Sequence, residues 1–413
     1  AKAYQLYLLS EGNNGTVAPI YNAATISSFR PIPLVPRKTP PLLPENANEE
    51  LAAKGLAECI VTDVYKGMNS STNQPHDYQL SYRMHQAIPA SPNSVAPGSI
   101  KYLRVLEQVP RPWGARRTYS GDEYDQQHAV ITKDTHLGLK IQHGIVTVEA
   151  DGSARFVVPA GRNIFLQALD ANYRAVHTER TYVNYMPGEV RSCVGCHEST
   201  AQSPGSAVRA TPIAMKRKAE VPFAQPGETA PRTLSYARDV QPVWDKHCVS
   251  CHAGDNPSGK LNLSGTLTNL FNTSYENLVP ERRRGRFDRG LLGPIMGENH
   301  PKQGNIHYLP ARSVGSYASV LVAMFAPDIQ LADNAAQARA AKLAKSHAKI
   351  KLTPGELLKV SNWVDTNAQY YGTYYGRRSI RFAKRPDFRP EYSVAEAIAP
   401  EAPSALVADA AKD

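Results

Sequence analysis

Apolar residues in the first half of the chain recur in short runs whose length and alternation are typical of β-strands. Polar or glycine-containing segments, typical of turns and loops, separate the runs. We expect an Asp-Gly hairpin turn at 151–152, between the third and fourth of these strands. The expected strands are 55–65, 100–108, 144–148, 154–159, 164–169 and 180–185.

Beyond residue 233 the apolar residues change to the spacing of an amphipathic helix. The segments 236–249 and 335–346 have this character, and the second is rich in alanine and lysine. A further helix is expected to start at Thr353, because Glu356 completes a capping box and Pro354 suits the first helical turn. We expect its buried stripe to consist of Leu357, Val360, Trp363 and Val364.

The remaining segments have the composition of connectors and tails. Strand-like pieces at 4–9 and 17–21 flank a Gly-Asn-Asn-Gly turn, and the proline-rich 31–45 is expected to be extended. The predicted organisation is residual strands and a proline-rich arm over 1–45, a β-rich domain over 46–200, a linker over 201–232, a helical domain over 233–380 and a tail over 381–413.

Composition places the chain among folded proteins with a basic surface. Of 413 residues, 42% are apolar, and 47 basic against 37 acidic residues give a net charge of +10. No apolar run approaches the about 18 residues that span a membrane, and no nucleic-acid-binding motif is present. The charge therefore argues only weakly for nucleic acid, and an acidic partner such as a redox protein, or haem propionates, is an equally good use of it. Because the chain opens Ala-Lys-Ala-Tyr, we expect a processed mature chain or a fragment.

The five cysteines carry the clearest chemical signal in the chain. Four of them lie in two copies of the pattern C-x-x-C-H, in which two thiols add to the vinyl groups of haem and the histidine ligates the iron. A thioredoxin-type pair leaves the histidines unexplained, and a disulfide across two residues is strained. A zinc site would have to bring together pairs that 51 residues separate. The two copies are Cys193, Cys196 and His197, and Cys248, Cys251 and His252.

Both motifs together predict two covalently bound haem c groups, with His197 and His252 as iron ligands. Because haem c is attached outside the cytoplasmic membrane, we expect a periplasmic or extracellular bacterial protein. The expected fold class is α+β, with a β-rich, sandwich-like middle domain bearing one haem and an α-helical cytochrome c-like domain bearing the other. Cys59 is left over, either as a small buried hydrophobic residue or as a metal ligand.

The order and content of several segments resemble the hydrazine synthase alpha subunit family. Those that resemble its middle domain are 62–67, 98–107, 151–161, 165–170 and 187–198. The segments 352–356 and 363–375 resemble the family's C-terminal cytochrome domain. Members of the family carry an N-terminal β-propeller, and 1–30 resembles the end of its last blade. The resemblance therefore implies a relative that lacks its propeller or has it on a separate chain.

The resemblance also implies roles for individual residues. In the family, a tyrosine four residues after the motif histidine binds the middle-domain iron, and that histidine joins a cysteine in binding zinc. Ala201 occupies the tyrosine's position, so His197 is expected to bind the iron in the ordinary way. Cys59 matches the zinc-binding cysteine and implies zinc nearby. The family places a histidine just before the capped C-terminal helix, which implies His347 as the ligand opposite His252.

Other side chains remain candidates for the axial positions. For the first haem we rank His177 first, because it lies in the strand pair just upstream of the motif, and an open position is the alternative. An open iron would bind a small molecule such as peroxide or a nitrogen oxide. The tyrosines between 370 and 375 are expected to pack around the edge of the second haem. The other candidates are His128, His136 and His143 for the first haem, and Met296, His300, His307 and Met324 for the second.

These observations favour a dihaem c-type cytochrome that passes electrons to a redox partner protein. The first alternative is an oxidoreductase whose first haem acts on a nitrogen oxide, a hydroxylamine- or ammonia-type compound or peroxide, while the second relays electrons. The other alternative is a conductive multihaem assembly, built as a homo-oligomer or filament. Occupancy of the sixth iron position separates the first two hypotheses, and native size tests the third.

Overall fold

The computed structural model describes the ranges 5–9, 15–21, 47–66, 95–109, 138–179, 182–196, 211–268, 271–279, 290–293 and 311–372, together with 24, 28, 32, 36, 68, 131 and 132. Several predicted features lie outside these residues. They are the greater part of the proline-rich arm, the tail over 381–413, His197, Ala201, His128, His136, Met296, His300 and His307. The chain forms two compact units, Ala1–Glu45 and Asn46–Asp413.

The first unit contains an antiparallel hairpin of β1 (Leu6–Leu9) and β2 (Val17–Tyr21), which confirms the two strands predicted there. Its large apolar side chains are exposed on both strands, with Leu8 at 61% and Ile20 at 59%. An isolated two-stranded hairpin is marginally stable, so these side chains contribute little burial within the unit itself.

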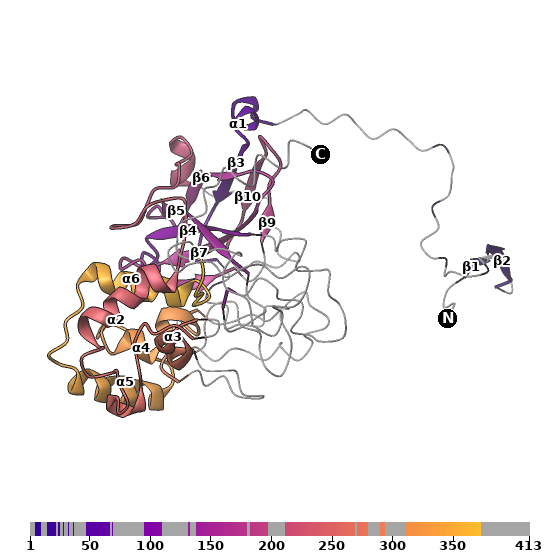
Figure 1. Ribbon diagram of the computed structural model, residues 1–413. Coiled ribbons are helices and arrows are strands. Elements are labelled where there is room, and N and C mark those ends of the chain that lie inside the picture. Colours follow the sequence, from indigo (N-terminus) through magenta and orange to yellow (C-terminus); the bar gives the residue numbers. More distant parts are fainter. Residues whose placement is uncertain are drawn as a thin grey trace. The chain divides into compact units, whose positions relative to one another are not determined.

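The second unit contains two β-sheets (Figure 1). One has the order β10–β3–β6, and the other has the order β11–β5–β4–β7–β8, with β9 paired to β7. All pairs are antiparallel except β10 with β3. The strands, preceded by the short helix α1 (Glu49–Ala53), are β3 (Leu56–Val61), β4 (Tyr102–Gln108), β5 (Lys140–Thr147), β6 (Ala154–Pro159), β7 (Asn163–Leu169), β8 (Ala175–Thr178), β9 (Val183–Asn184), β10 (Val190–Cys193) and β11 (Arg232–Thr233).

The Asp151–Gly152 turn corrects the predicted hairpin. β5 and β6, which flank this turn, belong to different sheets, because β5 pairs with β4 and β11 while β6 pairs with β3. Val146 and Phe156, one from each strand, are both fully buried in one core. The chain therefore folds over from one sheet to the other, so that both strands bury apolar side chains in the same core.

The described part of the predicted linker lies against both sheets. Glu220 forms a bridge with Phe156 of β6, and Phe223 forms one with Ile145 of β5. Gly144 permits the second approach: its φ is +126°, and a Cβ there would lie 2.6 Å from the Phe223 carbonyl oxygen. The segment 211–233, which includes a 3₁₀ turn at Ile213–Lys216, is thus part of the β-rich structure.

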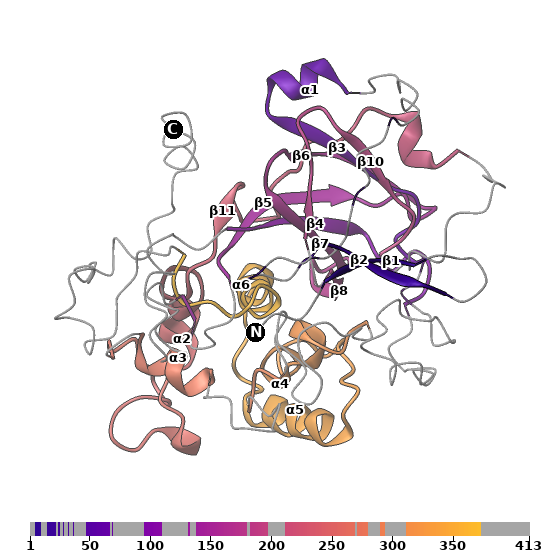
Figure 2. The same ribbon diagram turned by 90° about the vertical axis from the view of Figure 1, so that its right-hand side faces the viewer.

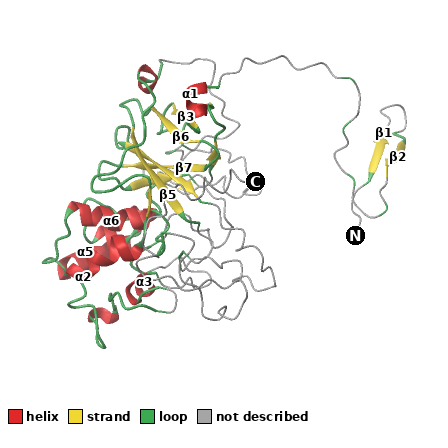
Figure 3. Cartoon of the chain, turned by 45° about the horizontal axis from the view of Figure 1, so that its top comes forward, coloured by secondary structure: helices red, strands yellow, loops and turns green. Residues whose placement is uncertain are grey.

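The helical part follows, and its long helices gather on one side of the sheets, away from α1 (Figures 2 and 3). The capping box at Thr353 and Glu356 is confirmed at the start of α6. Within the described ranges no helix is long and apolar enough to cross a lipid bilayer. The elements are a π-helical turn at Tyr236–Val240, α2 (Gln241–His247), a 3₁₀ turn at Ser258–Lys260, α3 (Thr273–Leu278), a 3₁₀ turn at Gly315–Ala318, α4 (Val320–Ala323), α5 (Asn334–Ser346) and α6 (Pro354–Asp365).

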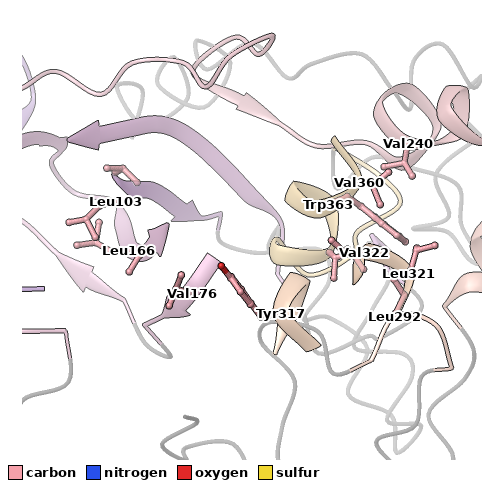
Figure 4. Close-up of a cluster of buried hydrophobic side chains, with 14 of the residues drawn as sticks. Leu103, Leu166, Val176, Val240, Leu292, Tyr317, Leu321, Val322, Val360 and Trp363 are labelled. Atoms are coloured by element: carbon pink, nitrogen blue, oxygen red, sulfur yellow. The ribbon is translucent and has the colours of Figure 1, made fainter. Parts of the chain in front are cut away.

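One hydrophobic core runs from the sheets into the helices (Figure 4). Leu103 and Leu166 of the sheet are at one end, and Trp363 of α6 is at the other, with Tyr317 between them. The Tyr317 hydroxyl donates a hydrogen bond of 2.7 Å to Asp170. Because this core is shared, the two parts are rigidly joined.

A buried polar junction lies beside this core. The Asp365 carboxylate accepts hydrogen bonds from the Ala175 amide at 3.0 Å, and from the Ser316 amide and hydroxyl at 2.7 and 2.9 Å. The Gln167 amide group donates to the Asp365 carbonyl at 2.8 Å, and Arg104 donates to the Gln167 side chain at the same distance. Asp365 and Arg104 are both 0% exposed, so α6 ends on a fully enclosed polar contact with the sheet.

Asp365→Asn tests the energetics of this junction. Burial raises the pKa of Asp365 to about 6. Since this lies above the pKa of about 4 of an unfolded aspartate, the stabilisation from protonation is complete below about pH 4 and is lost as the pH rises through about 6. From about pH 4 to about pH 7, the unfolding free energy of the wild type should fall by about 3 kcal/mol relative to the variant. Urea unfolding at both pH values measures this difference, and a constant difference contradicts the titration.

Candidate functional site

The second C-x-x-C-H motif lies at the end of α2, in a tight turn. The Cys248 amide donates to the Trp244 carbonyl at 2.8 Å, which ends the helix. The Cys251 and His252 amides both donate to the Cys248 carbonyl, at 3.1 and 2.9 Å. Cys248 is half-buried and Cys251 is exposed, so the turn presents one thiol toward the core and the other toward the surface.

The imidazoles of His252 and His347 face each other across a gap. Their ring centroids are 6.0 Å apart, and the ring planes differ by 16°. Two imidazoles on opposite sides of one metal ion, with bonds of about 2 Å, have centroids about 6 Å apart. The centroid separation is therefore compatible with one metal ion between the two rings.

The other nitrogen of each ring is held by a main-chain carbonyl. Nδ1 of His252 lies 3.1 Å from the Leu261 oxygen, and Nδ1 of His347 lies 2.9 Å from the Leu343 oxygen. A carbonyl only accepts, so in a neutral His252 ring Nδ1 donates and Nε2 keeps its lone pair. Nδ1 of His347 also lies 3.0 Å from the Ser346 hydroxyl, and donation to the Leu343 carbonyl leaves its Nε2 with a lone pair in the same way. This is the tautomer that a metal-ligating histidine needs.

A cavity of about 900 Å³ surrounds the two histidines and the two cysteines. This volume is at the upper end of the range of about 300–1,000 Å³ for small-molecule and cofactor sites. Most of its described walls are apolar, and they include no aspartate or glutamate. Two thiols, two facing imidazoles and apolar walls fit a large flat cofactor of the haem type. The apolar walls include Trp244, Leu261, Leu278, Leu321, Met324, Phe325, Leu343 and Ile350.

Glu356 connects the helix before this motif to α6. Its carboxylate accepts hydrogen bonds from Lys246 at 2.8 Å, from His247 at 3.2 Å and from the Thr353 amide at 2.8 Å. Hydrogen bonds from Lys246 and Thr353 lower the pKa of Glu356 to about 2. The end of α2 is therefore held against the start of α6 by a carboxylate that stays ionised.

The first motif follows β10, which pairs in parallel with β3. The Thr62 amide donates to the Cys193 carbonyl at 3.0 Å, and the Thr62 hydroxyl donates to the Val194 carbonyl at 2.8 Å. Gly195 approaches the chain so closely that a Cβ would lie 2.5 Å from the Lys66 carbonyl oxygen. The motif is thus fixed to the end of β3, while its histidine, His197, lies outside the described residues.

Three thiols gather beside this first motif. Cys59 is fully buried, and the Tyr185 hydroxyl donates to its sulfur at 3.2 Å. A hydrogen bond from Cys59 lowers the pKa of Cys193 to about 7, and the same contact, together with burial, raises the pKa of Cys59. Burial also raises the pKa of Cys196, and it raises the pKa of the neighbouring Glu179 to about 8. Cys193 is therefore the most acidic of the three thiols.

Zinc near Cys59 stays a prediction. Among the described residues, no three histidine, cysteine or acidic side chains converge in a way that could hold a metal ion. His197, which the family resemblance pairs with this cysteine, is not among them.

The candidate axial histidines of the first site are engaged in other contacts. His177 is buried in β8, and its Nδ1 accepts a hydrogen bond of 2.8 Å from the Thr178 amide, so a neutral ring carries its proton on Nε2. His143 donates through Nε2 to Glu107 at 2.8 Å. Iron ligation through Nε2 would require the other tautomer of His177 or loss of the His143–Glu107 contact. The sixth ligand of the first site stays a prediction.

The described tyrosines of the C-terminal cluster correct another expectation. Tyr370 and Tyr371 are 4% and 2% exposed and do not line the cavity. Tyr370 instead packs against Tyr236, Phe271 and Tyr275, with ring centroids 5.0–5.8 Å apart. These rings belong to the hydrophobic core. The Tyr236 amide donates a hydrogen bond to the Tyr370 carbonyl, which holds the segment around Tyr370 against this core.

Comparison with known proteins agrees with this arrangement. Residues 98–198 match the family described as "Hydrazine synthase alpha subunit middle domain". This part of the chain is similar to that middle domain. The solved structure of Kuenenia stuttgartiensis hydrazine synthase shares the fold, with 19% identity and a TM-score of 0.50 over 82% of this chain. The match spans 45% of that chain, and no curated protein matches this sequence.

The hydrazine synthase alpha-like region contains the first motif but begins after β3, which supplies Cys59. Sequence reasoning missed Tyr185 and Glu179, which lie beside Cys59 only because β3, β9 and β10 meet in space. It also missed the contact between the Leu343 carbonyl and Nδ1 of His347. The signal that points to this contact is the four-residue spacing between Leu343 and His347 at the end of a helix.

Glu356→Gln tests the connection between α2 and α6. The pKa of Glu356 is depressed, so its stabilisation is present above the unfolded pKa of about 4.5 and is lost as the pH falls toward about 2. Because the ion pair with Lys246 is largely exposed, we expect a loss of less than about 1 kcal/mol in the variant near neutral pH. Urea unfolding measures it. Glu50→Gln, which removes an exposed pair within one helix, is the control and should have a smaller effect.

Proposed function

We propose that this protein is a dihaem c-type cytochrome that transfers electrons outside the cytoplasmic membrane. The main support for this proposal is the pair of nearly parallel imidazoles of His252 and His347. Their ring centroids are 6.0 Å apart, and each Nδ1 atom lies within hydrogen-bond distance of a main-chain carbonyl. Cys248 and Cys251 would hold one haem, with His252 and His347 as its axial ligands. Cys193 and Cys196 would hold the other.

The residues of the second site suit an electron carrier. Bound haem supplies one-electron redox chemistry. The Leu261 and Leu343 carbonyls orient the imidazoles and increase their basicity as ligands. Apolar side chains form most of the described wall of the cavity. If both histidines ligated the iron, no position would remain on it for a substrate.

An oxidoreductase is the second candidate, and the likeness to hydrazine synthase alpha favours it. In this proposal the first site acts on a nitrogen oxide, a hydroxylamine- or ammonia-type compound or peroxide, and the second relays electrons. The matched family is named for a subunit, so we also propose that the chain assembles with other chains or with copies of itself.

His347→Ala tests the ligand pair. Loss of the second imidazole should convert one low-spin ferric signal in the electron paramagnetic resonance spectrum to high spin, and this centre should then bind cyanide. His177→Ala is the companion variant and should leave that signal unchanged. An unaltered spectrum in His347→Ala would exclude His347 as the ligand. In the wild type, a high-spin signal that shifts with nitric oxide would favour the oxidoreductase.

Cys193→Ser with Cys196→Ser tests the first attachment site. The pyridine haemochrome assay should give one haem per chain in place of two, since the second motif is untouched. Cys59→Ser should retain both haems and lose any zinc found by elemental analysis of the wild type. Two haems in the double variant would refute attachment at this motif.

A further inference from the structure

Unpaired positive charge gathers around the cavity of the second site. Four basic residues line it, and all four are exposed: Lys260, Arg339, Lys345 and Lys349. Among the described residues that line the same cavity, none is an aspartate or a glutamate. Among the described residues, none of the four has an ion-pair partner, and Arg339 donates only to the Gly290 carbonyl, at 3.5 Å.

Some basic residues elsewhere in the described structure are paired with a carboxylate, and others, such as Lys342 and Lys351, have no ion pair among the described residues. Arg155 of β6 lies 2.7 Å from Glu58, and Arg217 lies 2.6 Å from Glu149. Lys246 of α2, which directly precedes the cavity-lining residues His247 and Cys248 in the sequence, is paired with Glu356. Like charges left unpaired around one opening repel each other and do not stabilise the fold. Their placement therefore points to an acidic ligand.

We propose that these four cations form a docking surface for an acidic electron-transfer protein. The proposal rests on the proposed function, because the docked partner would exchange electrons with the second site. Four exposed cations exceed the two carboxylates of a haem. Cys251, one of the two attachment thiols, is exposed and lines the same cavity, so the cofactor edge would lie at this surface.

Charge complementarity of this kind accelerates encounter and suits a brief, weak complex. Redox complexes have small interfaces, below about 1,200 Å². Each encounter moves one electron. The reduced protein loses it, and a one-electron acceptor such as copper(II) gains it and becomes copper(I), with no bond or proton transferred.

The test is stopped-flow oxidation of the reduced holoprotein by plastocyanin, an acidic blue-copper protein. Lys345→Glu with Lys349→Glu reverses two of the lining charges. Lys342→Glu with Lys351→Glu makes the same change in net charge at exposed residues that do not line the cavity. We expect the wild-type rate constant to fall about tenfold between about 10 and 200 mM salt. The first variant should be about tenfold slower at low salt, and the second should stay within about twofold.

Equal slowing in both double variants would overturn the docking surface, since net charge alone would then account for the rate. A shifted Soret band or midpoint potential in Lys345→Glu with Lys349→Glu would also overturn it, by assigning these lysines to the haem carboxylates. Failure of the proposed function has a different signature, namely a wild type without the low-spin signal of a bis-imidazole haem.

Discussion

The arrangement of the second unit depends on the enclosed polar contact at the end of α6. A carboxylate that is 0% exposed is costly unless its hydrogen bonds are satisfied, and Asp365 accepts three from two residues of different elements. Arg104 reaches the same helix through Gln167. Because each donor is fixed in the fold, α6 has one position on the sheet. The start of α6 contacts the end of α2 through Glu356. The same helix therefore contacts the sheet at one end and the segment before the second C-x-x-C-H motif at the other.

The second site is preorganised by the main chain. Leu261 and Leu343 fix two imidazoles with carbonyl oxygens, which do not change protonation. A site whose ligands are held in place before and after an electron moves reorganises little. The first site differs, since Cys193 and Cys59 share a hydrogen bond and burial raises the pKa of Cys59 and Cys196. Two of its thiols, Cys59 and Cys196, are therefore held in the neutral form, whereas the pKa of Cys193 is lowered to about 7.

The sequence predicted those features of the fold that depend on residues close together in the chain. The apolar runs predicted β3 to β7, and Thr353 with Glu356 predicted the start of α6, because both signals lie within a few residues. The runs missed β8, β10 and β11, and the strand expected at 180–185 is only the two-residue β9. The Asp151–Gly152 hairpin was wrong, since the choice of partner strand depends on a core formed by distant segments. Composition also missed the pairing of 211–233 with the sheets, because backbone hydrogen bonding needs no apolar signature. The contact of Tyr185 with Cys59 joins positions 126 residues apart, beyond any local pattern.

The two sites therefore divide the chemistry unequally. In the proposed function, His252 and His347 would close both faces of the second haem, and the exposed basic residues that line its cavity would favour exchange with another protein over binding of a small substrate. The first site lies in the stretch that matches the hydrazine synthase alpha middle domain. Its two nearest described histidine candidates, His143 and His177, are committed to Glu107 and Thr178. If both sites bind haem, a small reacting molecule would bind to the iron of the first haem. The second haem would then supply or accept electrons, and the core shared by the sheets and the helices would set the distance between the two sites.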